Sequence, residues 1–203
     1  MTKGRLFVIS GPSGTGKGTI CSRLLNDTEN MVFSVSMTTR APRKCEKEGE
    51  DYFFVSREKF EIIKKQDGFL EWAHVYEDFY GTPKDAVMKK LQAGTDVLLD
   101  IDTQGAMNIR KTCPQGVFIF ILPPSMSELE KRIKDRAMDT DETIRIRMNG
   151  AMNELVHIKN YDYYIVNDEV DDAVSRIKAI VMAEHSRVDE DTEKMIEKYK
   201  EES

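Results

Sequence analysis

The chain has 203 residues, of which 40% are hydrophobic and 33% charged, and its formal net charge is −6 at pH 7. This composition is typical of one globular domain, and the acidic balance argues against a nucleic-acid binder, which normally carries a basic field. No apolar run is long enough to cross a membrane, and the N-terminal apolar stretch is too short for a signal peptide, so we expect a cytoplasmic protein without membrane partners.

Apolar strands and helices alternate along most of the chain. The predicted strands occupy residues 5–10, 31–36, 52–55, 69–75, 96–101, 117–122 and 163–166. The predicted helices occupy residues 17–26, 57–65, 83–94, 104–111, 127–136 and 171–184, with a further long helix from a capping segment at 139–142 to about 160. The polar stretch 38–51 is typical of a loop, and residues 80–83 (YGTP) predict a turn before a helix that Pro83 opens.

Continuous apolar strands alternating with helices indicate the α/β class, with a parallel sheet covered on both faces. The stretch 36–82 breaks this alternation, which predicts a lobe inserted between two parts of the core, at about 5–35 and 83–186. The charged tail 187–203 is expected to form a solvated or loosely docked helix. The three cysteines are widely spaced and odd in number, which predicts free thiols.

A phosphate-binding loop follows the first strand. Residues 11–17 (GPSGTGK) fit G-x-x-x-x-G-K, with a buried strand before and a helix after, and this context disfavours a chance glycine-rich turn. Backbone N–H groups of such a loop surround an anion, and the lysine adds a charge for the β and γ phosphates. The expected ATP-binding residues are Gly11, Pro12, Ser13, Gly14, Thr15, Gly16, Lys17, Gly18 and Thr19.

Gly18 departs from the general pattern, which has Ser or Thr after the lysine as a ligand for Mg²⁺. Two alternatives follow: Thr19 takes that role, or phosphates, water and a distant carboxylate hold the ion. The GKGT ending favours a small-molecule kinase over a typical GTPase.

Four further segments resemble the guanylate kinase family in order and spacing. They are SMTTRAPR from Ser36, GEDYFF from Gly49, FLEWAHVYEDFYG from Phe69 and LDIDTQG from Leu99. The resemblance covers about residues 5–185. It implies a P-loop core with a GMP-binding lobe at about 36–82 and a small lid at about 132–148.

The resemblance also assigns residues to GMP. Arg40 and Arg43 would hold its phosphate, since guanidinium groups pair with phosphate oxygens, and Tyr52 and Tyr80 would donate to the same oxygens. An acceptor-only carboxylate suits the N1–H and amine of guanine but not the acceptor that adenine presents. The GMP-binding set is Ser36, Arg40, Arg43, Tyr52, Glu71, Tyr80, Thr82, Asp100 and Asp102, with Glu71 and Asp102 on the guanine donors and Ser36 and Thr82 on its carbonyl.

Catalysis would need positioning and charge stabilisation but no protein nucleophile, because the attacking GMP oxygen is already anionic. The expected catalytic residues are Lys17, Arg40, Arg136, Arg147 and Asp100. Arg136 and Arg147 resemble lid arginines, Arg136 also counts among the ATP-binding residues with Asn167, and Arg132 is a weaker candidate. Mg²⁺, the expected cofactor, would lie near Thr19 and Asp100.

Two other functions fit part of the pattern. The first is a non-catalytic binding module with a guanylate kinase-like fold. Lys17 of the P-loop and the two arginines expected to hold the GMP phosphate, Arg40 and Arg43, argue against it. The second is a P-loop kinase for another phosphorylated acceptor, against which the guanine-reading residues argue. We expect ATP and GMP as partners and make no prediction about oligomeric state.

Overall fold

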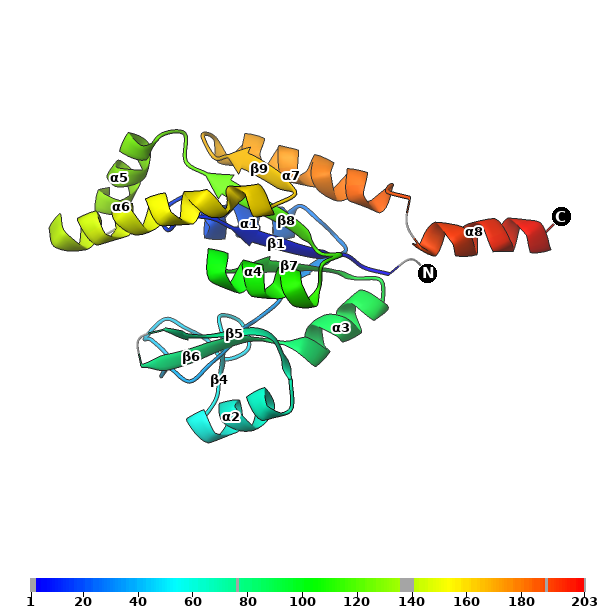
Figure 1. The fold of residues 1–203 in the computed structure, drawn as a ribbon, viewed down its shortest axis with the longest axis horizontal. Coiled ribbons are helices and arrows are strands. Elements are labelled where there is room, and N and C mark those ends of the chain that lie inside the picture. Colours follow the sequence, from blue (N-terminus) through cyan, green and yellow to red (C-terminus); the bar gives the residue numbers. More distant parts are fainter. Residues whose placement is uncertain (1–2, 76, 136–140, 189, 203) are drawn as a thin grey trace.

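The computed structural model describes residues 3–75, 77–135, 141–188 and 190–202. Its centre is a five-stranded parallel sheet with the strand order β2-β7-β1-β8-β9. The strands are β1 (Leu6–Ser10), β2 (Met31–Phe33), β7 (Asp96–Asp100), β8 (Val117–Leu122) and β9 (Tyr163–Val166). Helices cover both faces of this sheet (Figure 1), which confirms the predicted α/β class.

Alternate residues of the central strands face two separate hydrophobic cores. Phe7 and Ile9 of β1 pack with helices α1 (Lys17–Asn26) and α7 (Val170–His185) on one face. Leu6 and Val8 pack with α3 (Lys84–Gln92) and α4 (Thr103–Thr112) on the other. Because both faces are buried, the strands are apolar throughout rather than alternating, as the sequence pattern predicts. The carboxyl end of β1 leads directly into the glycine-rich loop before α1, and that of β7 leads into the short segment before α4.

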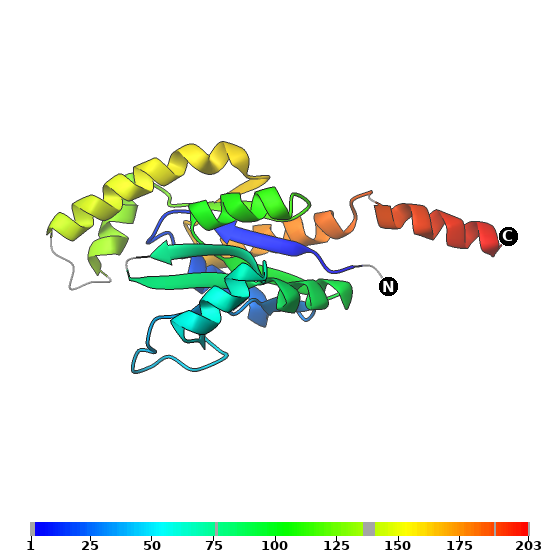
Figure 2. The ribbon, with the colours of Figure 1, turned by 60° about the horizontal axis from the view of Figure 1, so that its bottom comes forward.

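A second, four-stranded sheet with the order β4-β3-β6-β5 lies beside the core (Figures 1 and 2). Its strands are β3 (Met37–Thr38), β4 (Phe53–Phe54), β5 (Phe69–Val75) and β6 (Asp78–Pro83), and α2 (Arg57–Lys65) packs on it through Phe60. The parallel alternation stops here, as predicted for an inserted segment. The division of the chain into core, lobe and lid stays a proposal.

The predicted turn at residues 80–83 is wrong, because these residues end strand β6. They pair with β5 and β3, with Trp72 opposite Gly81 and Thr38 opposite Tyr80. A glycine is typical of a turn, but Gly81 allows close packing instead, because a Cβ at this position would lie 2.8 Å from the Phe69 ring. Strand β3 was missed for another reason: it has only two residues and lies at the start of a polar stretch.

Two further parts of the chain lie at opposite ends of the molecule in Figure 1. Helices α5 (Met126–Asp135) and α6 (Asp141–Leu155) pack together through Leu129, Ile133 and Ile144, and the 3₁₀ turn η1 (Val156–Asn160) leads on to β9. Helix α8 (Glu190–Glu201) extends from the body in both Figures 1 and 2, which agrees with the helix predicted for the tail. No helix within the described ranges is long and apolar enough to span a membrane.

Candidate active site

The loop between β1 and α1 curls because three of its glycines adopt positive φ angles: 141° at Gly11, 90° at Gly14 and 89° at Gly16. Side chains are strained in this region of backbone space, so the glycines are needed for the curve. The Lys17 ammonium donates to the carbonyl oxygens of Gly11, at 2.6 Å, and Pro12, at 3.1 Å. The lysine is therefore held over its own loop, at the N-terminus of α1, where the helix dipole favours an anion.

Asn167, which follows β9, supports the loop from behind. Its side-chain Nδ2 donates to the Thr15 carbonyl oxygen at 2.7 Å, and its backbone N–H donates to Leu122 at 2.8 Å. A Cβ on Gly16 would lie 2.5 Å from that Nδ2, so Gly16 and Asn167 pack in direct contact. The buried Asn167 amide thus fixes the loop's curvature in addition to lining the cleft beside it.

A cleft of about 280 Å³ opens beside the loop. Its lining residues are Gly14, Gly16, Thr19, Arg132, Asp135, Asn167, Asp168 and Val170. Arg132, on α5, donates to the Asn167 carbonyl oxygen at 3.0 Å and to Glu128 at 3.0 Å. A guanidinium fixed at the edge of a cleft next to a phosphate loop suits an anionic ligand, which favours Arg132 more than its sequence position alone does.

Asp100 and Thr19 lie on different sides of the first turn of α1. A Cβ on Gly18 would lie 4.0 Å from Asp100 Oδ2, whereas Thr19 is exposed and lines the cleft. Burial raises the pKa of Asp100, and the nearby Lys17 charge partly offsets this rise. Because Gly18 has no side chain, the space between α1 and the largely buried Asp100 carboxylate is left open.

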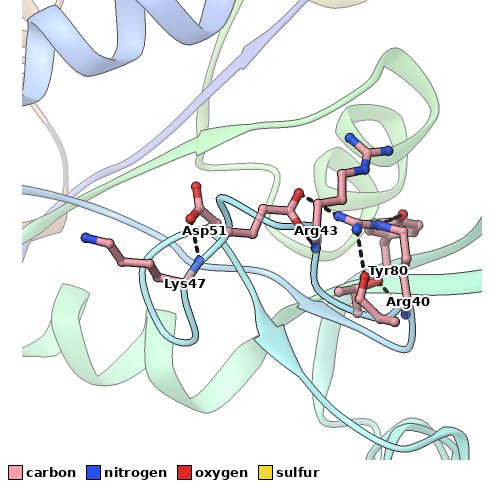
Figure 3. Close-up of polar contacts among 8 residues, drawn as sticks. Arg40, Arg43, Lys47, Asp51 and Tyr80 are labelled. Carbon is pink, nitrogen blue, oxygen red and sulfur yellow. Dashed lines mark hydrogen bonds and ion pairs between the residues drawn. The ribbon is translucent and has the colours of Figure 1, made fainter.

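Arg40, after β3, is held by three neighbours (Figure 3). Its Nε donates to the Tyr80 hydroxyl oxygen at 3.1 Å, Nη2 to Glu46 Oε1 at 2.8 Å, and Nη1 to the Ala41 carbonyl oxygen at 2.8 Å. A guanidinium has five N–H donors. Within the described residues, these bonds leave one N–H on each terminal nitrogen, and guanidinium N–H groups suit phosphate oxygens as acceptors.

Aromatic rings complete this arginine cluster. The Tyr52 ring lies 5.6 Å from the Arg40 guanidinium carbon and makes an edge contact with Tyr80 at 5.8 Å. Burial raises the pKa of Tyr52, so its hydroxyl remains a donor at neutral pH. Arg43 is exposed and extends away from Arg40 in Figure 3, while its backbone N–H donates to Glu46 Oε2 at 2.8 Å. The structure thus brings Arg40, Tyr52 and Tyr80 together and leaves the Arg43 side chain outside.

Glu71 on β5 lies where the second sheet meets α4. Its Oε1 accepts the Thr82 hydroxyl at 2.8 Å. Asp102 caps α4 by accepting the Gly105 N–H at 2.7 Å, and both carboxylates lie beside the position that a Cβ on Gly105 would take. Burial raises the pKa of Glu71 to about 7, with Asp102 adding to the rise and the Thr82 hydrogen bond opposing it. Glu71 is therefore a fixed, half-buried acceptor whose charge changes near neutral pH.

Comparison with known proteins assigns the chain to a family. Residues 3–184 match the guanylate kinase family. The chain belongs to the guanylate kinase family. It is 51% identical to the guanylate kinase of Caldanaerobacter subterraneus subsp. tengcongensis, over 92% of this chain and 91% of the relative, and 49% identical to that of Clostridioides difficile, over 98% of both. A crystal structure of guanylate kinase from Anaplasma phagocytophilum has a TM-score of 0.74 and 38% identity, covering 92% of this chain and 89% of the other.

Membership of the guanylate kinase family accounts for the kinase class of the chain but leaves the individual residues to be argued. Ser36 is half-buried before β3, and Thr82 is fully buried and donates to Glu71 rather than pointing freely into a pocket. Arg147 is exposed on α6. Arg136 lies outside the described residues, so the predicted pair of lid arginines is placed only in part.

Two carboxylates near the guanylate kinase site were missed from the sequence. Glu46 pairs with Arg40, and this pairing holds the pKa of Glu46 below its usual range. Glu154 on α6 is half-buried, and burial raises its pKa while the Lys17 charge lowers it. Glu46 lies in the sequence between Arg43 and Tyr52, and this position could have indicated its role. Glu154 lies on a helix about 140 residues from Lys17, so its position in the sequence gave no such indication.

Proposed function

We propose that the protein transfers the γ-phosphoryl group of ATP to GMP by direct in-line displacement. A GMP phosphate oxygen attacks the γ-phosphorus, the bond to the β,γ-bridging oxygen breaks, and ADP and GDP result. The observation that carries this proposal is Glu71, which is acceptor-only when ionised and is fixed by Thr82 on the same small sheet as the Arg40–Tyr80 pair. The same small sheet thus offers groups for a guanine base and for its phosphate.

On the ATP side, the backbone of residues 11–19 would surround the phosphates, and Lys17 would leave the carbonyl oxygens of its loop for the β and γ phosphates. The cleft beside Arg132 and Val170 would take the rest of the nucleotide. We propose that Asn167 acts mainly by holding the loop through Thr15, and that Arg147 and Arg136 approach the phosphates when the lid closes. Closure would also exclude water, which competes with GMP for the phosphoryl group.

On the GMP side, the two remaining N–H groups of Arg40 would pair with phosphate oxygens, and the Tyr52 and Tyr80 hydroxyls would donate to the same group. Arg43 would join them by a rotation of its exposed side chain. Glu71 would accept from guanine N1–H and the amine, with Asp102 assisting, and Ser36 is the better placed donor for the guanine carbonyl because the Thr82 proton is already given to Glu71.

Mg²⁺ fits the residues on the Asp100 side of the loop. When bound with ATP, it would help to offset the charge that develops on the phosphates. Asp100, whose pKa responds to the Lys17 charge, would help to hold the ion, because Gly18 leaves open the space beside this carboxylate. Thr19 lines the cleft instead.

The compartment and the partners are also proposals. We propose a cytoplasmic location, which three free cysteines support, and ATP and GMP as the partners. The proposed reaction is tested by ADP release, coupled to NADH oxidation, with GMP, AMP, UMP and a ribose phosphate as acceptors. We expect ADP release with GMP far above the other three; a chain that binds GMP without releasing ADP would instead be a binding module, and one that prefers the ribose phosphate would be another kinase.

A further inference from the structure

Glycine occupies an unexpected position near the start of α4. Gly105 is the third residue of the helix after the Asp102 cap, and it is buried. Glycine is less favourable than alanine inside a helix, and a capped helix favours Glu or Gln at this position. The backbone there does not adopt a positive φ angle, so its conformation would accept any residue. A reason other than backbone freedom must explain the glycine.

The space where a side chain would begin is taken by another part of the chain. A Cβ on Gly105 would lie 3.3 Å from Glu71 Oε2, 3.4 Å from Asp102 Oδ1 and 3.5 Å from Glu71 Cδ. The contact with Glu71 Oε2 is tighter than ordinary van der Waals packing, so that oxygen would have to move by a few tenths of an ångström, whereas the other two distances are at or near ordinary contact. Asp102 is bonded to the Gly105 N–H and Glu71 is held at its other oxygen by Thr82, so neither carboxylate moves without weakening a hydrogen bond.

We propose that Gly105 is a specificity-determining position of the GMP site, because its missing side chain keeps the place that the Glu71 carboxylate needs in order to meet the guanine edge. Gly105 thus acts through Glu71 and is a positioning residue. The inference rests on the proposed function. It explains why a residue unfavourable to the helix stands inside the LDIDTQG segment, at the point where β5 approaches α4.

Gly105→Ala tests this inference, with Gly150→Ala as the matched control. Gly150 is also a helical glycine, in α6, and a Cβ there would meet nothing within 4 Å. Both substitutions favour helix, so neither should lower the melting temperature through propensity. For Gly105→Ala we expect KM for GMP to rise about tenfold, the scale of a weakened hydrogen bond to a charged group, with kcat and KM for ATP within about twofold. Gly150→Ala should leave all three unchanged.

A double-mutant cycle separates positioning from general damage. Calorimetric titration with GMP would compare Gly105→Ala in the wild-type background and in the Glu71→Ala background, where no carboxylate obstructs the added methyl group. We expect the loss of affinity in the first background and less than a twofold change in the second. Equal losses in both, an unchanged KM for GMP, or a joint fall in kcat and melting temperature would overturn the inference. Wild-type protein without GMP affinity would instead overturn the proposed function, and this inference with it.

Discussion

The two halves of the site are built in different ways. In the half proposed for ATP, one continuous segment, residues 11–19, carries the backbone curve and the lysine that would meet the phosphates, and Asn167 supports it. The half proposed for GMP takes side chains from separate segments, and each is held by another side chain: Arg40 by Glu46 and Tyr80, and Glu71 by Thr82. A phosphate chain can be bound by local backbone, whereas reading a base requires side chains that only the tertiary structure assembles.

Lys17→Ala should give the largest effect, because it removes the one charge that the loop offers to the transferring group. We expect kcat to fall by about 10³-fold, the scale of losing one group that stabilises developing charge, with GMP affinity nearly unchanged. Steady-state ADP release measures the first and calorimetry the second. Lys89→Ala, an exposed position on α3, is the control. Near-normal turnover in Lys17→Ala would mean that the ATP half does not work through this loop.

Arg40→Ala should lower kcat/KM for GMP by about 100-fold and leave KM for ATP within a factor of two. The loss includes paired contacts to the phosphate, and it also leaves the Glu46 carboxylate uncompensated near a dianion. Arg43→Ala lacks this second cost because its side chain is not paired with Glu46, so we expect only about a tenfold loss. Steady-state titration of each substrate measures both variants. A larger loss for Arg43→Ala than for Arg40→Ala would show that the Arg43 side chain moves into the site when GMP binds.

The GMP half should also respond to pH in a way that the ATP half does not. With the pKa of Glu71 at about 7, its carboxylate is ionised above that pH and protonated below it. The protonated group is a weaker acceptor and turns an O–H donor toward the guanine donors. KM for GMP should therefore be constant above about pH 8 and rise roughly tenfold at pH 6. The GMP phosphate itself titrates near pH 6, so Glu71→Gln is the control that retains only that titration. Parallel profiles for the two proteins would remove Glu71 from the explanation.

The same contrast explains what the sequence could predict. The loop, its flanking strand and helix, and the parallel sheet follow from local patterns, since glycines, apolar runs and β-branched residues act on their immediate neighbours. The structure around Gly81 was predicted wrongly because this glycine is required by close packing against Phe69, a contact across the sheet. The residues that could hold GMP were found through motif resemblance, but their pairings, such as Arg40 with Glu46 and Thr82 with Glu71, depend on distances that no spacing rule contains.

The most direct measurement of the central claim is the ratio of kcat/KM for GMP to kcat/KM for AMP, in the wild-type protein and in Glu71→Gln. A site whose buried acceptor pairs with a substrate donor can reject the analogue that lacks it by about 10⁴-fold, and we expect a wild-type ratio of that order. Glutamine supplies one acceptor and one donor, so the ratio should fall at least tenfold (roughly the worth of one hydrogen bond to a charged group) while KM for ATP holds. A wild-type ratio near one, or a ratio that Glu71→Gln leaves unchanged, would contradict the account.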